Sequence, residues 1–495
     1  GKILTAVNTN ASFVYTYYGH TGRLATVTQT DNFSSTPTTI TYTYSSEGQL
    51  EKLSDSDGLV TFYGYNVNNQ LSYIDFKPSS SESNAVDITY DNLQRRTGVS
   101  YSNGTNTKYK YDEASRLTEI ESITSLGSNN SVRYSYDKAG NIVSRDYTNN
   151  LPITKNQTFG YDDINQLVNG TNTFTGLDKS YQLDILGNRL GVDGGGPHAI
   201  YDKQNRIVED LKNLYSHDLE GNLTVITDKT TGHVTKLSWN SENQLIEFTV
   251  GESLTSMPTK IVKYFYGPLG RRIAKSVDGV VESYVYNNSQ IHKASKATDI
   301  RYFIYTDRID EPIFMKNNAT VYSYQHDIIG SVIGLVDQSG SVEEQYAYED
   351  FGQMKIYDSA GLEKNSSQLL GNLFGFTARD FDVESDFYYY RARYYSAGTA
   401  RFLSEDPIGF RGLDENLYRY VVNAPLIFVD PSGKVTLKDV KKKIKDAVGS
   451  VVDACKRKAD KLKKDVEKIK KGTDDAMDYF KKKFDEANRF NDEEE

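Results

Sequence analysis

The sequence predicts a mainly β protein in which repeated hairpins wind into a spiral, forming a hollow shell or part of one, followed by an α-helical C-terminal tail. Three observations carry this prediction: a composition rich in Tyr and Gly, a short motif that recurs along most of the chain, and an abrupt change of composition after Gly433. Tyr favours strands, and Gly favours the turns that join them.

The composition narrows the class of protein. The 495 residues include 38 Tyr, 21 Phe, one Trp, 37 Gly and only 10 Pro. The formal net charge of −10 argues against a chain built as a whole to bind nucleic acid. No apolar run approaches the roughly 18 residues of a membrane helix, and the single cysteine, Cys455, excludes an intrachain disulfide and a Cys-rich zinc cluster. The chain opens in what reads as the middle of a repeat, so we expect a piece of a longer protein.

One motif recurs at intervals of about 16–27 residues. An aromatic residue is followed by Asp or Asn, a few polar residues, Gly or Asn, another polar residue, and Leu or Ile. Examples are YTYSSEGQL ending at Leu50, YGYNVNNQL ending at Leu71, YKYDEASRL ending at Leu117 and YSYDKAGNI ending at Ile142. Further copies end at Leu167, Leu190, Ile207, Leu223, Leu245 and Ile273.

Each copy reads as two short strands joined by a turn. In Tyr109-Lys110-Tyr111 both Tyr side chains fall on one strand face, because side chains alternate along a strand. Asp112 opens the turn by accepting backbone N–H groups, and Gly or Asn later in the copy accepts a positive φ. A stack of such hairpins buries the apolar face that one alone cannot, and Tyr suits a broad sheet with one wet side. An ordinary β-sandwich with chance similarity between strands is the alternative.

These copies resemble the tyrosine-aspartate (YD) repeats of Rhs proteins, of Tc toxin C components and of teneurins. The resemblance covers most of residues 1–363, which we assign to a YD-repeat β-shell. A later segment is similar to the Rhs repeat-associated core, and it reads NLFGFTARDFDVESDFYYYRARYYSAGTARFLSEDPIGFRGLDENLYRYVVNAPLIFVDPSG. We therefore expect residues 364–433 to form a second domain and residues 434–495 to form a variable tail. The resemblance implies that the core closes one end of a hollow shell and that the chain beyond it is cargo, often a toxin.

The core segment holds an aromatic run, Tyr388 to Tyr395, which we predict to be one strand with Arg391 and Arg393 on the same side. These arginines either stack on Tyr rings and pair with carboxylates, or hold a catalytic carboxylate. Two Asp-Pro-x-Gly motifs, at 406–409 and 430–433, follow and predict tight turns.

The resemblance adds a function to these turns. In Rhs proteins and Tc toxin C components the matching aspartates form an aspartyl autoprotease, so Asp406 and Asp430 are the candidate catalytic pair. Two adjacent carboxylates cannot both ionise easily, so one acts as acid while the other activates water. The family pattern continues with Leu where this chain has Lys434, which puts the cleavage in doubt. The Lys434–Val435 bond is the expected target.

The tail from Lys434 onward carries 19 Lys and Arg against 15 Asp and Glu. Its apolar residues recur every three or four positions up to Ile469, which predicts an amphipathic helix, and a second helix follows from Asp474. The tail contains no His, which argues against His-dependent nucleases and zinc deaminases. It is either a solvated helix pair, with Cys455 as a small core residue, or a membrane-active or partner-binding element.

Two functions remain. The first is a bacterial polymorphic toxin whose shell encapsulates and delivers a C-terminal effector. The resemblance then implies secretion or delivery machinery and an immunity protein as partners, and a secreted or cell-surface location. The second is a surface adhesion protein without enzymatic activity, whose partner is a glycan or a membrane surface. Neither requires a cofactor or a metal. His217-Asp218 and His326-Asp327 occupy the Tyr-Asp position of the repeat, so we interpret them as repeat variants rather than catalytic dyads.

Overall fold

The computed structural model describes residues 2–34, 36–77, 83–192, 198–365 and 369–434. The chain divides into two units, residues 1–110 with 117–440 and residues 111–116 with 441–495. The described part of the second unit is one turn, in which Asp112 Oδ1 accepts the N–H groups of Ala114 and Arg116. The predicted tail helices lie outside the described residues. The first unit holds the long sheets and the C-terminal core segment.

Two long antiparallel sheets, in which the strands pair in chain order, form what we call the wall. The first contains β1 (Thr5–Val7), β2 (Ala11–Tyr17), β3 (Leu24–Asp31), β4 (Thr38–Tyr44), β5 (Leu50–Asp55), β6 (Val60–Tyr65), β7 (Leu71–Lys77), β8 (Asn84–Tyr90), β9 (Arg96–Tyr101), β10 (Asn106–Tyr111), β11 (Leu117–Ile123), β12 (Ser131–Tyr136), β13 (Ile142–Thr148), β14 (Asn156–Tyr161), β15 (Leu167–Thr171), β16 (Asp178–Leu183) and β17 (Arg189–Val192).

The second sheet continues the same hairpin pattern after residues 193–197. It contains β18 (Ile200–Tyr201), β19 (Ile207–Glu209), β20 (Asn213–His217), β21 (Leu223–Asp228), β22 (Val234–Trp239), β23 (Leu245–Gly251), β24 (Lys260–Tyr266), β25 (Arg272–Val277), β26 (Val280–Asn287), β27 (Gln290–Lys296), β28 (Asp299–Tyr305), β29 (Pro312–Asn317), β30 (Thr320–His326), β31 (Val332–Val336), β32 (Val342–Tyr348) and β33 (Met354–Tyr357).

The repeat prediction is confirmed strand by strand. The motif Leu or Ile is the first residue of the return strand in eight of the ten copies and the second residue in the other two, at Leu190 and Ile273. The Asp or Asn of the motif accepts the N–H groups two and four residues ahead, as Asp162 does from Ile164 and Gln166. The intervening left-handed residue is usually Gly or Asn, but Gln94 and Ser115 adopt the same conformation.

The motif aromatic has a role that the pattern did not reveal. The side-chain O–H or N–H of this aromatic residue donates to a backbone carbonyl of an earlier hairpin. That carbonyl belongs to the motif Leu or Ile, or to the residue next to it, where the return strand begins. Tyr161 and Tyr305 donate to the carbonyls of Ile142 and Ile291 at 2.9 and 2.8 Å. The one Trp, Trp239, donates its indole N–H to the Leu223 carbonyl at 2.7 Å. Further Tyr donors in the same position are Tyr65, Tyr90, Tyr136, Tyr201, Tyr266, Tyr286 and Tyr348. Phe cannot make this bond, which gives a physical reason for Tyr at this position of the repeat.

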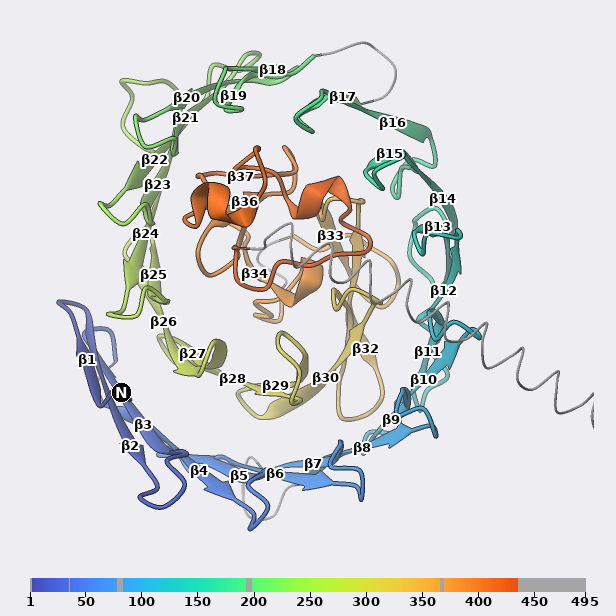
Figure 1. Cartoon of the computed structure of the whole chain (residues 1–495). Helices are drawn as coiled ribbons and strands as arrows, with labels where there is room; N and C mark the ends of the chain where they lie inside the picture. The colour runs from blue at the N-terminus through green and yellow to red at the C-terminus, as the bar shows by residue number, and fades with distance from the viewer. Residues whose placement is uncertain (1, 35, 78–82, 193–197, 366–368, 435–495) are drawn as a thin grey trace, which may run out of the picture. The chain divides into compact units, whose positions relative to one another are not determined.

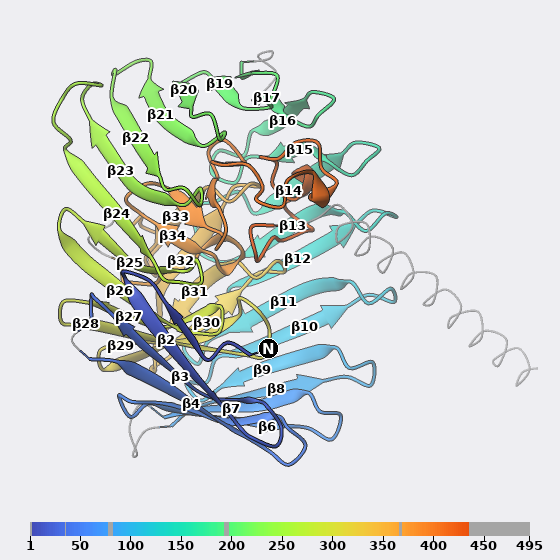
Figure 2. The ribbon, with the colours of Figure 1, turned by 60° about the vertical axis from the view of Figure 1, so that its left-hand side comes forward.

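The two sheets pack face to face along part of their length (Figures 1 and 2). Phe76 on β7 contacts Phe314 on β29, and both lie in a buried cluster that joins β6–β9 to β28–β30. The strands from β25 to β32 are mostly buried on both faces. The expectation of one wet side is therefore wrong there, because one face meets the first sheet and the other meets the C-terminal core segment.

The C-terminal core segment, residues 369–434, is surrounded by the wall strands of this unit (Figure 1). It contains a small sheet of β34 (Asp380–Asp382), β35 (Phe387–Tyr389), β36 (Tyr394–Ser396) and β37 (Arg401–Phe402), with 3-10 turns at Phe376–Ala378, Gly409–Gly412 and Val421–Asn423.

Polar contacts anchor the core segment to the wall. On β25 of the wall, the buried Arg272 pairs with Asp382 at 2.5 Å, and Lys275 contacts the same carboxylate at 3.2 Å. Elsewhere in the core segment, Arg401 donates to the Asn188 side chain and to the Asn205 carbonyl. The core segment is therefore held by wall hairpins that are far apart in the sequence.

Candidate autoproteolytic site

Both Asp-Pro-x-Gly motifs form the predicted tight turns. Asp406 Oδ1 accepts the Ile408 N–H at 3.0 Å, and the Asp406 carbonyl accepts the Gly409 N–H at 2.7 Å. Asp430 Oδ1 accepts the N–H groups of Ser432 and Lys434 at 3.2 and 3.0 Å. These local bonds fix each carboxylate relative to its own backbone.

One arginine brings the two turns together. Arg393 Nη2 lies 3.0 Å from Asp406 Oδ2 and 3.5 Å from Asp430 Oδ2. Arg393 and Asp430 are buried, at 4% and 1% exposure. The two aspartates named from the sequence, 24 residues apart, thus share one guanidinium nitrogen.

Arg393 also holds the backbone of the second turn. Its Nε donates to the Gly433 carbonyl at 2.6 Å, and its Nη1 donates to the Leu417 carbonyl at 2.9 Å. The guanidinium lies over the Phe402 ring, 3.5 Å from the centroid. Arg393 therefore stacks on an aromatic ring, Phe402 rather than the expected Tyr, and pairs with carboxylates, as one of the two alternatives expected; a role in catalysis stays a prediction.

The prediction of a single strand from Tyr388 to Tyr395 is wrong. The run forms the end of β35, a turn, and the start of β36, which pair as a hairpin. Arg391 lies in the turn with a left-handed φ of 59°, so it leaves the strand and points toward the wall instead of lying beside Arg393. The reversal lets Tyr388 and Tyr389 pair with Tyr395 and Tyr394 across the hairpin, where all four rings are buried.

Burial sets the electrostatics of the pair. Burial raises the pKa of Asp406 above its usual value; Arg393 opposes this shift, and the nearby Asp430 adds to it. Burial lowers the pKa of the Arg393 guanidinium, while its attraction to Asp406 and Asp430 works in the other direction. A carboxyl with a raised pKa beside a second carboxylate is an arrangement that supports combined acid and base chemistry.

Lys434, the first of the two predicted cleavage residues, lies next to this pair. The backbone N–H of Lys434 is bonded to Asp430, and the preceding carbonyl is bonded to Arg393. Gly433 has a φ of +69°, and a Cβ there would lie 2.5 Å from the Tyr390 carbonyl. Only glycine therefore fits where the chain passes the carboxylates. Val435 lies outside the described residues.

Sequence reasoning missed Asp310, which lies in the wall between β28 and β29 and pairs with Arg391 at 2.5 Å. Asp310 lies outside the Tyr-Asp position of the repeat, so the sequence pattern gave no indication of its contact with the core segment. The histidines singled out from the sequence serve in the repeat: the adjacent Asp218 and Asp327 make the usual turn bonds. Burial lowers the pKa of His217 and of His326 to about 4.

Metal-binding clusters and membrane-crossing helices are absent from the part of the chain that the structure describes. The described residues contain no group of three or more His, Cys, Asp or Glu placed to hold a metal ion. No helix among them has the length and apolar character needed to cross a membrane.

Comparison with known proteins places the chain in a family. A family model described as Teneurin YD-shell matches residues 9–423. The chain is 29% identical over 289 residues to the tRNA3(Ser)-specific nuclease WapA of Bacillus spizizenii, an alignment that covers 55% of this chain and 12% of the relative. It is 28% identical over 244 residues to the probable deoxyribonuclease RhsA of Dickeya dadantii, covering 46% of this chain and 16% of the relative.

The toxin protein Tse5 of Pseudomonas aeruginosa is 22% identical over 326 residues, which cover 52% of this chain and 24% of that protein. Among solved structures, the complex TcdB2-TccC3-Cdc42 aligns with 90% of this chain and 24% of its own, at a TM-score of 0.64 and 18% identity, which establishes a shared fold. The chain thus spans a small part of each relative. With its hairpin wall, its enclosed core segment and a family match over most of its length, this chain belongs to the teneurin YD-shell family, alongside Rhs proteins and Tc toxin C components.

Proposed function

We propose that this chain is the shell region of a bacterial Rhs-type toxin, which encloses and delivers a C-terminal effector. We further propose that Asp406 and Asp430 release the effector by cutting the Lys434–Val435 bond. The single observation that carries the proposal is the contact of one buried arginine with both carboxylates and with the carbonyl of Gly433. The relative named as toxin protein Tse5 supports the class, as does the length of the relatives beyond the matched region.

The chemistry follows from the charges. In this proposal Asp406, whose pKa burial raises, acts as the acid, and Asp430, whose carboxylate accepts backbone N–H groups, acts as the base. The ionised carboxylate takes a proton from water, and the resulting hydroxide attacks the carbonyl carbon of Lys434. The protonated carboxyl gives its proton to the departing nitrogen of Val435. The products are a carboxylate at Lys434 and a free amine at Val435.

The role of Arg393 in this proposal is electrostatic. Its positive charge lies 3.0 and 3.5 Å from the two carboxylates and stabilises negative charge on them, and its Nε bond fixes the backbone one residue before the cleaved bond. Preorganised donors of this kind commonly contribute 10²–10³-fold to a rate. Delivery to a secreted or cell-surface location, with delivery machinery and an immunity protein as partners, belongs to the same proposal.

A denaturing gel tests the cleavage. The full chain should yield a fragment corresponding to residues 435–495, and Asp406→Asn and Asp430→Asn should abolish it. Asp337→Asn is the matched control, because Asp337 makes the same kind of turn bonds to Ser339 and Ser341 far from the pair. Lys434→Leu, which restores the usual family residue, should accelerate cleavage. A chain that stays intact with either residue at position 434 would contradict the proposal.

A growth assay tests the cargo. Residues 434–495 expressed inside bacteria should arrest growth, whereas the uncleaved Asp430→Asn chain should not. Equal growth in both cultures would favour the alternative function, an adhesion protein whose tail is a docking element.

A further inference from the structure

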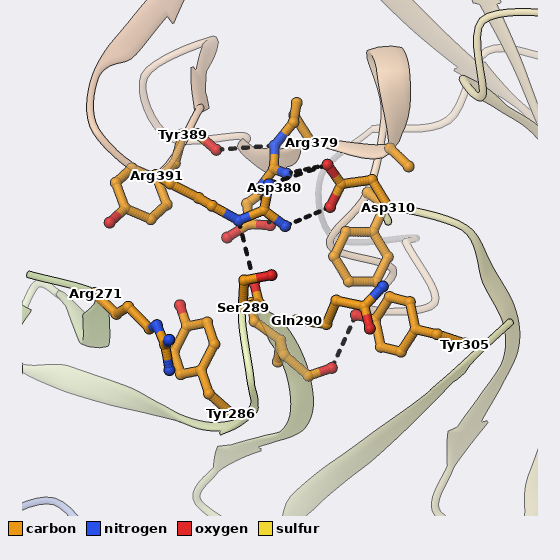
Figure 3. A pocket seen from close by; sticks show the side chains of 13 residues that line it. Arg271, Tyr286, Ser289, Gln290, Tyr305, Asp310, Arg379, Asp380, Tyr389 and Arg391 are labelled. Carbon is orange, nitrogen blue, oxygen red and sulfur yellow. Dashed lines mark hydrogen bonds and ion pairs between the residues drawn. The ribbon is translucent and has the colours of Figure 1, made fainter. Parts of the chain in front are cut away.

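Arg391 links the wall to the second Asp-Pro-x-Gly turn. Its guanidinium makes a two-pronged pair with Asp310, with Nη1–Oδ2 and Nη2–Oδ1 distances of 3.0 and 2.5 Å (Figure 3). Its Nε donates to the Ser289 carbonyl at 3.2 Å, and its Nη1 also donates to the carbonyl of Pro431. One side chain therefore joins two wall turns to the residue that follows Asp430.

We infer that Asp310, acting through Arg391, positions the Asp430 turn, so that the carboxylate pair is complete only when the wall docks on the core segment. This inference rests on the proposed self-cleavage. Asp310 and Arg391 are positioning residues, since neither contacts Asp406 or the bond to be cut.

The geometry of Arg391 supports a dedicated role. A non-glycine residue with a φ of 59° is uncommon and costs energy, so it persists only where the surroundings hold it. Here the bidentate pair with the Asp310 carboxylate holds Arg391, and a further N–H of the same guanidinium donates to the Pro431 carbonyl. Asp310 itself has a left-handed φ of 58° and forms a second ion pair, with Arg379 at 2.7 Å.

The Asp430 turn is thus held from two sides by one hairpin. Arg393 fixes the Gly433 carbonyl and contacts the carboxylates, while Arg391 fixes the Pro431 carbonyl and contacts the wall. Without Asp310, Arg391 loses its ion pair, and with it the contact that stabilises its left-handed backbone conformation. The Pro431 carbonyl is then free to rotate, and the turn that carries Asp430 rotates with it.

The first test measures the rate of cleavage of the full chain after pulse-labelled cell-free synthesis. Asp310→Asn and Arg391→Gln should each slow cleavage by about 10- to 100-fold, as expected for a displaced catalytic group. The double variant should be no slower than Arg391→Gln alone, because the inference assigns the effect of Asp310 on cleavage to its pair with Arg391 and not to its pair with Arg379. Additive losses would overturn the inference.

Glu384→Gln is the matched control, because it breaks a 2.9 Å ion pair with Lys275 that joins the same wall and core segment but touches neither Asp-Pro-x-Gly turn. It should leave the rate within about twofold. If Glu384→Gln slows cleavage as much as Asp310→Asn does at the same loss of thermal stability, the effect is general destabilisation and the inference fails.

The second test does not depend on cleavage. In the intact Asp406→Asn chain, Arg391→Gln should accelerate amide hydrogen exchange at Ser432, Gly433 and Lys434 and leave the wall strands unchanged. Unchanged exchange at these three amides would overturn the inference. If the unmodified chain never cleaves while exchange responds as expected, the proposed function is wrong but the positioning of the turn stands.

Discussion

Replacing Tyr305 with Phe isolates the hydrogen bond that we consider the reason for the Tyr-rich repeat. The buried hydroxyl donates to the Ile291 carbonyl at 2.8 Å, beyond the last paired residues of β27 and β28 at Lys293 and Tyr302. Phe keeps the ring and its edge contact with Phe374. The substitution therefore removes one donor and leaves a buried carbonyl without it.

Leaving a buried acceptor unsatisfied costs about 1–3 kcal/mol. For the roughly 420 described residues the entropy of unfolding is about 0.9 kcal/mol/K, so Tyr305→Phe should lower Tm by about 1–3 °C. Combining it with Tyr266→Phe and Tyr286→Phe, which lose equivalent bonds to Leu245 and Arg272, should lower Tm by about 3–9 °C if the three act independently.

The assay is calorimetry, with denaturant unfolding as the second measurement. Tyr63→Phe is the control: Tyr63 is a partly buried strand Tyr whose hydroxyl makes no hydrogen bond within the described part of the chain. It should change Tm by less than about 1 °C. If the triple variant is as stable as Tyr63→Phe, ring packing alone explains the Tyr content and the hydroxyl argument is refuted.

Three further predictions address burial, charge and backbone conformation. Arg272→Met removes the nearer of the two cations that pair with the buried Asp382 and leaves Lys275, so it should lower the free energy of unfolding by about 3 kcal/mol in urea. Burial raises the pKa of Asp327 to about 6, so the folded state holds its proton more tightly and stability falls as pH rises from about 4 to about 6. Asp327→Asn should therefore stabilise the chain by about 3 kcal/mol at pH 7.5 and have no effect below pH 4. Gly433→Ala should slow self-cleavage at least 10-fold, whereas Gly58→Ala, with a φ of +91° but open space around it, should not.

The hairpin wall could be predicted because its determinants are local. The Asp112 turn, the left-handed residue after it and the Leu that restarts the strand all lie within six residues, so one copy carries its own structure. Repetition then fixes the architecture. The bond from each Tyr to an earlier carbonyl was missed because the pattern records the residue type but not the partner, which lies 12 to 21 residues earlier in the sequence.

The candidate site could be predicted only in part. Turn chemistry marked Asp406 and Asp430, and the resemblance paired them, but the choice of Arg393 over Arg391 depends on a reversal of the chain at positions 390–393. That reversal follows from tertiary burial. The contact of Arg391 with Asp310 joins residues 81 positions apart, and no local pattern specifies such a pairing.

Intact-mass spectrometry with N-terminal sequencing of the purified chain tests the central claim most directly. Self-release by the Asp406–Asp430 pair predicts a small product beginning Val-Thr-Leu-Lys at Val435, which is absent from the Asp430→Asn protein. A product that begins elsewhere, or one that persists when Asp430 is replaced, would contradict the account.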